Sequence, residues 1–269
     1  MPGVIDHLKF FYSDYEQLNE DSYIDFYVKV RKPGNLRNWI HRQVVFELDD
    51  FRPFKPLPYS QACAHLEWGL NWCIASQLHQ YLIIHCAVVA KDSIGLLLPG
   101  TPGSGKSTLC AGLVAKGWRL LSDEMALIRL DDLEVEPVPR PISLKNTSIE
   151  VMHSYFPTAA FGPIIPDTIK GRLTHLQVPK HAIKQQHKKI AISHIVFPQY
   201  KEGSETNLNK KDKARACMKL VENSFNFNIL GSEGFEACAD IVDKAECYDL
   251  QYSDLDTSIC ALGDCFGVK

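Results

Sequence analysis

The clearest hydrophobic pattern lies in the middle of the chain. Every position from Tyr81 to Ala90 is apolar except His85, and after a polar turn at 91–93 a second apolar run extends from Ile94 to Pro99. We expect both runs to form strands. Because three residues cannot hold the crossover that parallel strands need, the pattern predicts an antiparallel hairpin.

A helix and two more strands are predicted directly after this hairpin. The helix is expected to begin at the end of a glycine-rich segment and to continue to about Lys116, before a glycine that can end it. Trp118–Ser122 predicts a short strand that leads into Asp123 and Glu124, and the run Met125–Leu130 predicts another.

Weaker patterns precede this core. Residues 23–30 and 44–48 are rich in β-forming side chains and predict strands, and Ser60 is placed to cap a helix with apolar positions at helical spacing. We interpret residues 1–80 as a small N-terminal α+β part with a packing or assembly role, and residues 81–269 as the catalytic domain.

The second half of the chain predicts alternating helices and strands. Thr147–Glu150 fits a capping box that opens a short helix. The Pro, Gly, Lys and His content of residues 155–190 predicts loops and exposed surface. We further expect strands at 192–197 and 247–252, helices at 211–222 and 232–243, and a capped helix after Asp254.

The composition is that of an ordinary globular protein. Hydrophobic residues make up 45% and charged residues 23% of the 269 positions, which argues against a disordered or fibrous chain. The formal net charge is −3 without a long basic block, so no nucleic-acid partner is expected. No apolar run approaches the ~20 residues that cross a bilayer, and the polar start does not resemble a signal peptide, so no membrane partner is expected.

The nine cysteines favour a reducing compartment. Their number is odd, no two have the CxxC spacing, and most lie in apolar runs, whereas a disulfide framework or a zinc ribbon needs a more regular pattern. We therefore expect buried free thiols and a cytoplasmic location.

A glycine-rich segment carries the most specific chemical signal. Gly100–Ser107 matches GxxxxGK[ST] completely, between a predicted strand and a predicted helix. Its glycines allow backbone N–H groups to face phosphate oxygens, Lys106 can reach the β- and γ-phosphates, and the Ser107 hydroxyl can bind Mg²⁺. The cofactors are thus expected to be ATP and Mg²⁺. The nucleotide-binding positions are expected to be Gly100, Thr101, Pro102, Gly103, Ser104, Gly105, Lys106, Ser107 and Thr108.

Two consecutive acids are expected near the bound phosphates. One helix of ordinary length separates Lys106 from the strand that ends at Asp123 and Glu124. One acid can hold Mg²⁺ while the other accepts the proton of an attacking hydroxyl. The alternatives are that the acids merely end a strand, or that they hold the metal for hydrolysis by water. The predicted hairpin and the lack of the LSGGQ and NKxD signatures count against common ATPase and GTPase classes.

These residues resemble a known kinase family. His85, the hairpin, GTPGSGKST and GWRLLSDE together resemble the catalytic core of HPr serine kinase/phosphorylase, and more closely the HPr-kinase-related kinases (HprK-related kinase A), over about 81–155. Segments at 195–198, 222–226 and 234–236 are similar to the related branch. The resemblance implies an α/β phosphate-loop core of the phosphoenolpyruvate-carboxykinase-like type, with a mixed sheet and flanking helices.

The resemblance also implies an activity and roles for site residues. It implies ATP-dependent phosphorylation of a serine hydroxyl on a protein or peptide, with Asp123 as the base, Glu124 helping to hold Mg²⁺ and His85 near the phosphates. Asp123 is a second candidate ligand of the metal. The HPr enzyme forms hexamers, so a homo-oligomer is a further implication.

Two departures from the HPr enzyme narrow this expectation. The glycine-rich signature linked to its phosphorolytic reaction is replaced here by residues 139–146, and Thr108 follows Ser107 where that enzyme tends to have an acid. The first departure means that phosphorylase activity and HPr as the substrate do not follow from the resemblance. The second removes one carboxylate that could lie near Mg²⁺.

Transfer of a phosphoryl group also calls for a second cation. Arg140, between two prolines, is our first choice for a catalytic cation, and the other candidates are Lys145, Lys170 and Arg172. Together with Asp123, Lys106 and His85, Arg140 completes the expected catalytic set. The competing hypotheses are an ATP-binding or ATP-hydrolysing regulatory module and a small-molecule kinase.

Overall fold

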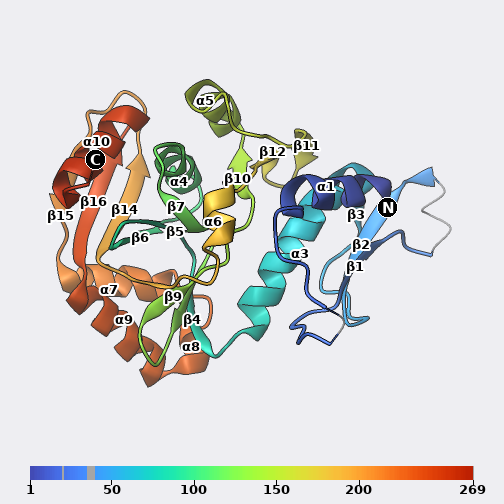
Figure 1. Ribbon diagram of the computed structural model, residues 1–269, viewed down its shortest axis with the longest axis horizontal. Helices are drawn as coiled ribbons and strands as arrows, with labels where there is room; N and C mark the ends of the chain where they lie inside the picture. The colour runs from blue at the N-terminus through green and yellow to red at the C-terminus, as the bar shows by residue number, and fades with distance from the viewer. Residues whose placement is uncertain (20, 35–39, 269) are drawn as a thin grey trace.

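The computed structural model describes residues 1–19, 21–34 and 40–268. It has a mixed α/β fold, in which a larger body and a smaller N-terminal part lie along the long axis of the molecule (Figure 1). The body is built on a six-stranded sheet with the strand order β15-β16-β14-β6-β5-β7. In that order the strands span Asn207–Lys210, Glu246–Tyr252, His194–Tyr200, Ile94–Pro99, Cys86–Lys91 and Arg119–Ser122.

This central sheet is mixed, as expected for the fold class. Strand β14 is parallel to both of its neighbours, β16 and β6. Strand β5 is antiparallel to β6 and to β7, and β15 is antiparallel to β16. The predicted β5–β6 hairpin is therefore confirmed. Because β5 lies between β6 and β7, the strand that leads to Asp123 is parallel to the strand of the glycine-rich loop but is not its direct neighbour.

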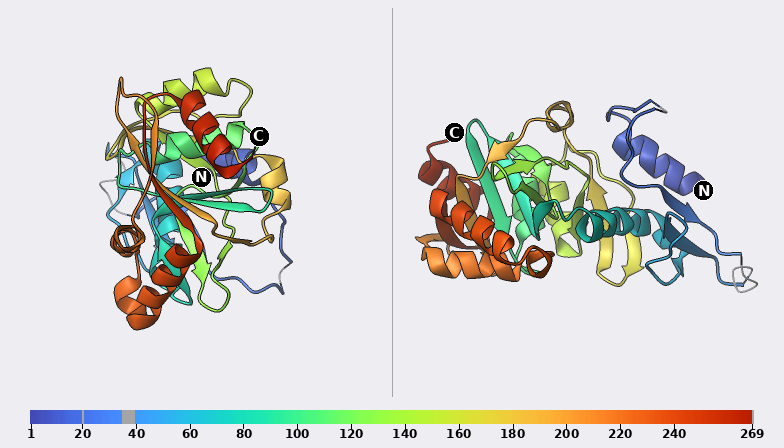
Figure 2. Two further views of the ribbon diagram at one scale, coloured as in Figure 1. Left: turned by 90° about the vertical axis from the view of Figure 1, so that its left-hand side faces the viewer. Right: turned by 90° about the horizontal axis from the view of Figure 1, so that it is seen from below.

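Helices cover both faces of the sheet because side chains alternate along each strand (Figure 2). Ala87 and Val89 of β5 pack in the core formed with α4 and α10, whereas Cys86 and Val88 face the core formed with α7 and α9. These four helices span Lys106–Ala115, Leu255–Phe266, Lys213–Glu222 and Ser232–Lys244, and the short α8 spans Phe227–Leu230. The predicted helices at 106–116, 211–222 and 232–243 are confirmed.

The apolar run 81–90 is two strands and not one. The chain breaks at His85, so that β4 (Tyr81–Ile84) pairs with β8 (Ala126–Arg129) in a second sheet while β5 remains in the central sheet. The backbone N–H of His85 donates to Asn223 O at 2.8 Å, a bond that belongs to neither sheet. The second sheet is completed by β9 (Glu134–Glu136) and β13 (Ile190–Ala191).

A third sheet corrects the prediction of loops and exposed surface at 155–190. Strands β10, β12 and β11 span Ile142–Lys145, Gly171–Leu176 and Ile165–Thr168, and α6 follows at Lys180–Lys184. Leu173 is fully buried, and it packs with Ile165 against Ala64 and Trp68 of the N-terminal part. The sequence pattern misses this sheet because its burial comes from a distant segment of the chain.

The described residues of the N-terminal part form a small sheet and the helices α1 and α3. Its strands β1, β2 and β3 span Val28–Arg31, Gln43–Leu48 and Leu57–Pro58, and its helices α1 and α3 span Pro2–Tyr12 and Ala62–Gln77. The strand at 44–48 is confirmed, whereas only the end of the predicted strand at 23–30 pairs with it. The N-terminal part has a hydrophobic core of its own, which contains Val44, Phe46 and Leu66.

The cap predictions are confirmed in one case and wrong in two. Asp254 accepts a hydrogen bond from Thr257 N at 2.9 Å and caps α10. Ser60 instead lies in a 3-10 turn before α3, whose N-cap residue Gln61 makes no side-chain capping bond. Thr147 is already the first helical residue of α5 (Thr147–Tyr155), and Ser148 Oγ bonds Lys145 instead of closing a capping box.

Candidate active site

The glycine-rich loop joins the end of β6 to the start of α4, as its pattern predicts. Gly103 and Gly105 have φ values of +88° and +85°, which favour glycine. Ser104 N donates to Thr101 O at 3.1 Å inside the loop. The Ser104 hydroxyl is buried and has no hydrogen-bond partner among the described residues. The loop therefore holds left-handed backbone turns and a spare polar side chain, both of which suit an anionic ligand.

Two tyrosines that were not predicted support this loop. Tyr252 Oη donates to Gly105 O at 2.9 Å, and Tyr200 N donates to Ser104 O at 2.9 Å. A Cβ atom on Gly105 would meet the Tyr252 hydroxyl and would lie 2.9 Å from Tyr200 Cβ. Both tyrosines end strands of the central sheet, β16 and β14, so the loop is held against the carboxyl edge of the sheet.

Lys106 and His85 meet at the start of α4. Lys106 is only 7% exposed, and its Nζ lies 2.8 Å from His85 Nε2. Burial, and then the positive charge of Lys106, lower the pKa of His85 to about 4. The imidazole is therefore neutral near pH 7, and its Nε2 accepts a hydrogen bond from the ammonium group. The break between β4 and β5 places His85 here.

Glu124 approaches the same nitrogen of His85 that Lys106 contacts. Glu124 Oε1 is 3.7 Å from His85 Nε2. Burial works against ionisation of Glu124, but the charges of Lys106 and Lys145 outweigh it and hold its pKa below the usual value. The structure thus brings Lys106, His85 and Glu124 together, with a carboxylate available as a hard oxygen ligand.

Asp123 differs from its neighbour in both burial and charge. It is 5% exposed, and Ser143 N donates to its Oδ2 at 2.8 Å. Burial, and then the negative charge of Glu124, raise the pKa of Asp123 to about 7. Two adjacent carboxyl groups with separated pKa values are typical of sites that move a proton, because one can stay ionised while the other exchanges it.

Both acids line a cavity that is shared between the body and the N-terminal part. Lys145 and Lys170 contribute its positive charge, and Lys170 Nζ lies 5.4 Å from the centre of the Trp68 ring. The lining residues are Glu67, Trp68, Asn71, Asp123, Glu124, Arg140, Pro141, Ser143, Lys145, Lys170 and His175. The sequence pattern missed the contribution of α3, although Glu67 was visible as an acid within an apolar helix.

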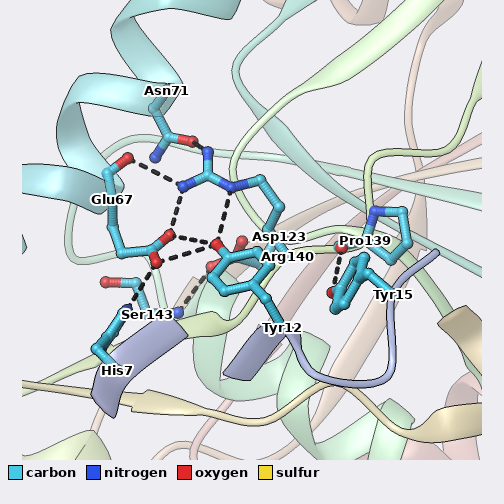
Figure 3. Close-up of polar contacts among 9 residues, drawn as sticks. All are labelled: His7, Tyr12, Tyr15, Glu67, Asn71, Asp123, Pro139, Arg140 and Ser143. Atoms are coloured by element: carbon cyan, nitrogen blue, oxygen red, sulfur yellow. Dashed lines mark hydrogen bonds and ion pairs between the residues drawn. The ribbon is translucent and has the colours of Figure 1, made fainter. Parts of the chain in front are cut away.

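Arg140 borders this cavity, but its guanidinium group is engaged by the N-terminal part (Figure 3). It forms an ion pair with the Glu67 carboxylate, donates to Glu67 O at 3.1 Å, and also bonds the Asn71 side chain. These contacts favour a positioning role over the direct neutralisation expected from the sequence. Among the other cation candidates, Lys145 and Lys170 line the cavity, whereas Arg172 pairs with Glu150 at 2.6 Å.

The oxygen donors at this site suit Mg²⁺ bound together with phosphates and water better than a metal ion held by protein side chains alone. The part of the chain that the structure describes has no group of three or more His, Cys, Asp or Glu side chains that could hold a metal. Mg²⁺ is usually bound by one or two carboxylates together with substrate phosphates and water. Ser107, in the first turn of α4, and the carboxyl groups of Glu124 and Asp123 are oxygen donors of this kind.

Most of the cysteines are buried, as expected, but three are not. All nine cysteines are free, and Cys63, Cys260 and Cys265 are the ones that are not buried. Among the described residues, no helix is long and apolar enough to span a bilayer.

Comparisons with known proteins leave the family open. No protein-family model matches the chain, and no curated protein is similar to it. Among solved structures, the Hpr(Ser) kinase/phosphatase from Coxiella burnetii has a TM-score of 0.31 and 11% sequence identity, over 66% of this chain and 90% of that chain.

Proposed function

We propose that this protein is an ATP-dependent phosphotransferase that transfers the γ-phosphate to a hydroxyl group, most simply a serine of a protein or peptide. The observation that carries the proposal is the convergence of a complete phosphate loop with an unequal acid pair. Lys106 contacts His85 at 2.8 Å, His85 approaches Glu124 at 3.7 Å, and Asp123 follows at the cavity wall. A nucleotide clamp alone has no need of a carboxyl group with a pKa near 7 beside it.

Each part of the site has a role in this reaction. The amides of residues 100–108 and the positive end of α4 bind the phosphates, and Lys106 neutralises the β- and γ-oxygens. Ser107 and Glu124 would hold Mg²⁺, which supplies charge neutralisation when it is bound. Lys145 and Lys170, which share a cavity wall with the two acids, would add positive charge near the transferring group.

Asp123 would act as the base. The acceptor oxygen forms a bond to the γ-phosphorus while the bond from that phosphorus to the β–γ bridging oxygen breaks, and ADP leaves. The proton of the acceptor hydroxyl passes to the free oxygen of the Asp123 carboxylate, because Oδ2 already accepts the Ser143 N–H. A base with a pKa near 7 is suited to this exchange at neutral pH.

The test uses ATP labelled at the γ-phosphate, incubated with the protein and with host lysate. We expect one labelled acceptor with the natural chain and none with Asp123→Asn, while a fluorescent ATP analogue binds both with similar affinity. Full transfer by Asp123→Asn would remove the base assignment. Release of phosphate without a labelled acceptor would favour a hydrolysing regulatory module, and a labelled product of low molecular weight would favour a small-molecule kinase.

A further inference from the structure

A buried polar cluster connects the N-terminal part to the catalytic domain. Its centre is the carboxylate of Glu67, a residue that is 3% exposed. His7 Nε2 lies 2.8 Å from Oε1, the Tyr12 hydroxyl donates to Oε1 and Oε2 at 3.0 and 2.9 Å, and Arg140 forms an ion pair with Oε2 (Figure 3). Although burial opposes ionisation, Arg140 and then His7 hold the pKa of Glu67 at about 2.

The N-terminal part holds the segment 139–143 at two consecutive residues. Besides the contacts of Arg140, the Tyr15 hydroxyl donates to Pro139 O at 2.6 Å. Tyr12 lies in α1 and Tyr15 in the turn after it, whereas Glu67 lies in α3. Two separate segments of the N-terminal part therefore contact residues 139–140.

The same segment carries the hydrogen bond to Asp123. Directly after Arg140 and Pro141 the chain enters β10, an edge strand whose Ser143 N donates to Asp123 Oδ2 at 2.8 Å. This donor occupies one carboxylate oxygen and leaves the other for a proton. Among the strands that the structure describes, β10 has a partner on one side alone. The sheet by itself therefore holds this edge less firmly than it would hold an interior strand.

We propose that Glu67 is a positioning residue for the transfer reaction: by holding Arg140, it fixes the segment 139–143 so that the Ser143 N–H orients the Asp123 carboxylate toward the acceptor. This inference rests on the proposed function for its effect on catalysis, but its structural step can be measured without activity. It gives the N-terminal part a role in catalysis besides the packing role that its sequence indicates.

A matched pair of substitutions separates positioning from general stability. Glu67→Gln removes the central carboxylate, and Glu47→Gln is the control, because Glu47 is also a buried acid of the N-terminal part and is paired with Arg31 and Arg52 at 2.6 Å each. We expect Glu67→Gln to lower kcat roughly tenfold or more, as misplacement of a reacting group does, with an unchanged Kd for a fluorescent ATP analogue. Glu47→Gln should leave kcat within about twofold of the natural chain.

A double variant keeps the test valid if Glu67→Gln does not fold because it leaves Arg140 unpaired. Glu67→Gln with Arg140→Met removes both charges and avoids a buried unpaired cation. The positioning role predicts that this variant recovers thermal stability but not kcat. A kcat equal to that of the natural chain, or an equal loss in Glu47→Gln, would overturn the proposal.

Hydrogen exchange supplies a readout that does not depend on turnover. The Ser143 amide should exchange faster in the double variant than in the natural chain and in Glu47→Gln, because its segment has lost the Arg140 contact. Equal protection in all three proteins would contradict the positioning role. If the natural chain transfers no phosphate but this difference in exchange is present, the proposed function fails while the link from Glu67 to Ser143 stands.

Discussion

At the scale of single residues, neighbouring acids acquire different properties from their surroundings. Asp123 is buried beside a like charge and accepts one backbone N–H, whereas Glu124 lies near Lys106 and Lys145. Burial therefore decides the protonation of the first, and nearby cations decide that of the second. In the proposed reaction, this difference suits Asp123 to accept a proton and Glu124 to bind the metal in its ionised form.

The raised pKa of Asp123 has a consequence for stability. Its pKa is about 7 in the folded protein and 3.8 as the ordinary value, so the folded state binds a proton that the unfolded chain releases between these two pH values. The proton on Asp123 therefore stabilises the folded protein fully below about pH 4. This stabilisation is lost as the pH rises through 7. We expect Asp123→Asn, which remains neutral, to be more stable than the natural chain by about 1–3 kcal/mol at pH 8 and by much less at pH 4.

Urea unfolding at pH 4, 6 and 8 measures this difference. Asp240→Asn, on the exposed surface of α9, is the matched control and should follow the natural chain at each pH. A pH-independent effect of Asp123→Asn would show that Asp123 does not titrate in this range in the folded protein.

At the scale of secondary-structure elements, the break at His85 depends on a segment far away in the sequence. Residues 223–226 cover the open edge of β4: Phe225 N donates to Ile83 O, and Ile84 forms a bridge with Ser224. The Asn226 side chain accepts a hydrogen bond from Ile83 N at 2.9 Å and donates one to Tyr81 O at 2.7 Å. It thereby satisfies the backbone groups at this edge as a further strand would. Strand β4 can then leave the central sheet and direct His85 toward Lys106.

Asn226→Ala should therefore destabilise the protein more than an ordinary polar substitution does. It leaves the N–H of the buried Ile83 and the carbonyl of Tyr81 without these partners, at a cost of about 2–4 kcal/mol. Chemical denaturation gives the free energy of unfolding, and Asn228→Ala, an exposed asparagine of α8, is the control with an expected change below about 0.5 kcal/mol. Equal effects of the two substitutions would mean that the edge of β4 is satisfied in another way.

At the scale of the whole molecule, the proposed reaction takes place where the two parts of the chain meet. The loop and the acids belong to the body, whereas Glu67, Trp68 and Asn71 of α3 complete the cavity wall. Binding energy from a nucleotide on the body can therefore stabilise the folded chain as a unit, because Arg140 and Glu67 link the parts through a buried ion pair.

We expect ATP with Mg²⁺ to raise the melting temperature of the full chain. At a nucleotide concentration of about 100 times Kd the gain is about 2.7 kcal/mol, or roughly 5 °C or more for a chain of this size. Differential scanning calorimetry measures the shift, and chelation of the metal with EDTA should reduce it. Lys106→Ala should largely abolish the shift, and an undiminished shift in that variant would count against phosphate binding by the loop.

Local signals determined the parts of this protein that could be predicted from its sequence. The glycine-rich loop, the β5–β6 hairpin and the helices α4, α7 and α9 depend on turn residues, spacing and apolar periodicity within short stretches. The acids at positions 123 and 124 were also recognisable, because they follow a strand one helix after the loop. Neighbouring residues alone specify such features, so the sequence displays them directly.

Tertiary structure decided the features that join distant segments. The split of 81–90 at His85 depends on Asn223 and Asn226, and the buried sheet within 155–190 depends on packing against α3. The partner of Arg140 is Glu67, 73 positions earlier in the chain. Side chains brought together by folding have no fixed spacing in the sequence, and for that reason only the folded chain determines which charges are paired, which acid keeps its proton and which surfaces enclose the site.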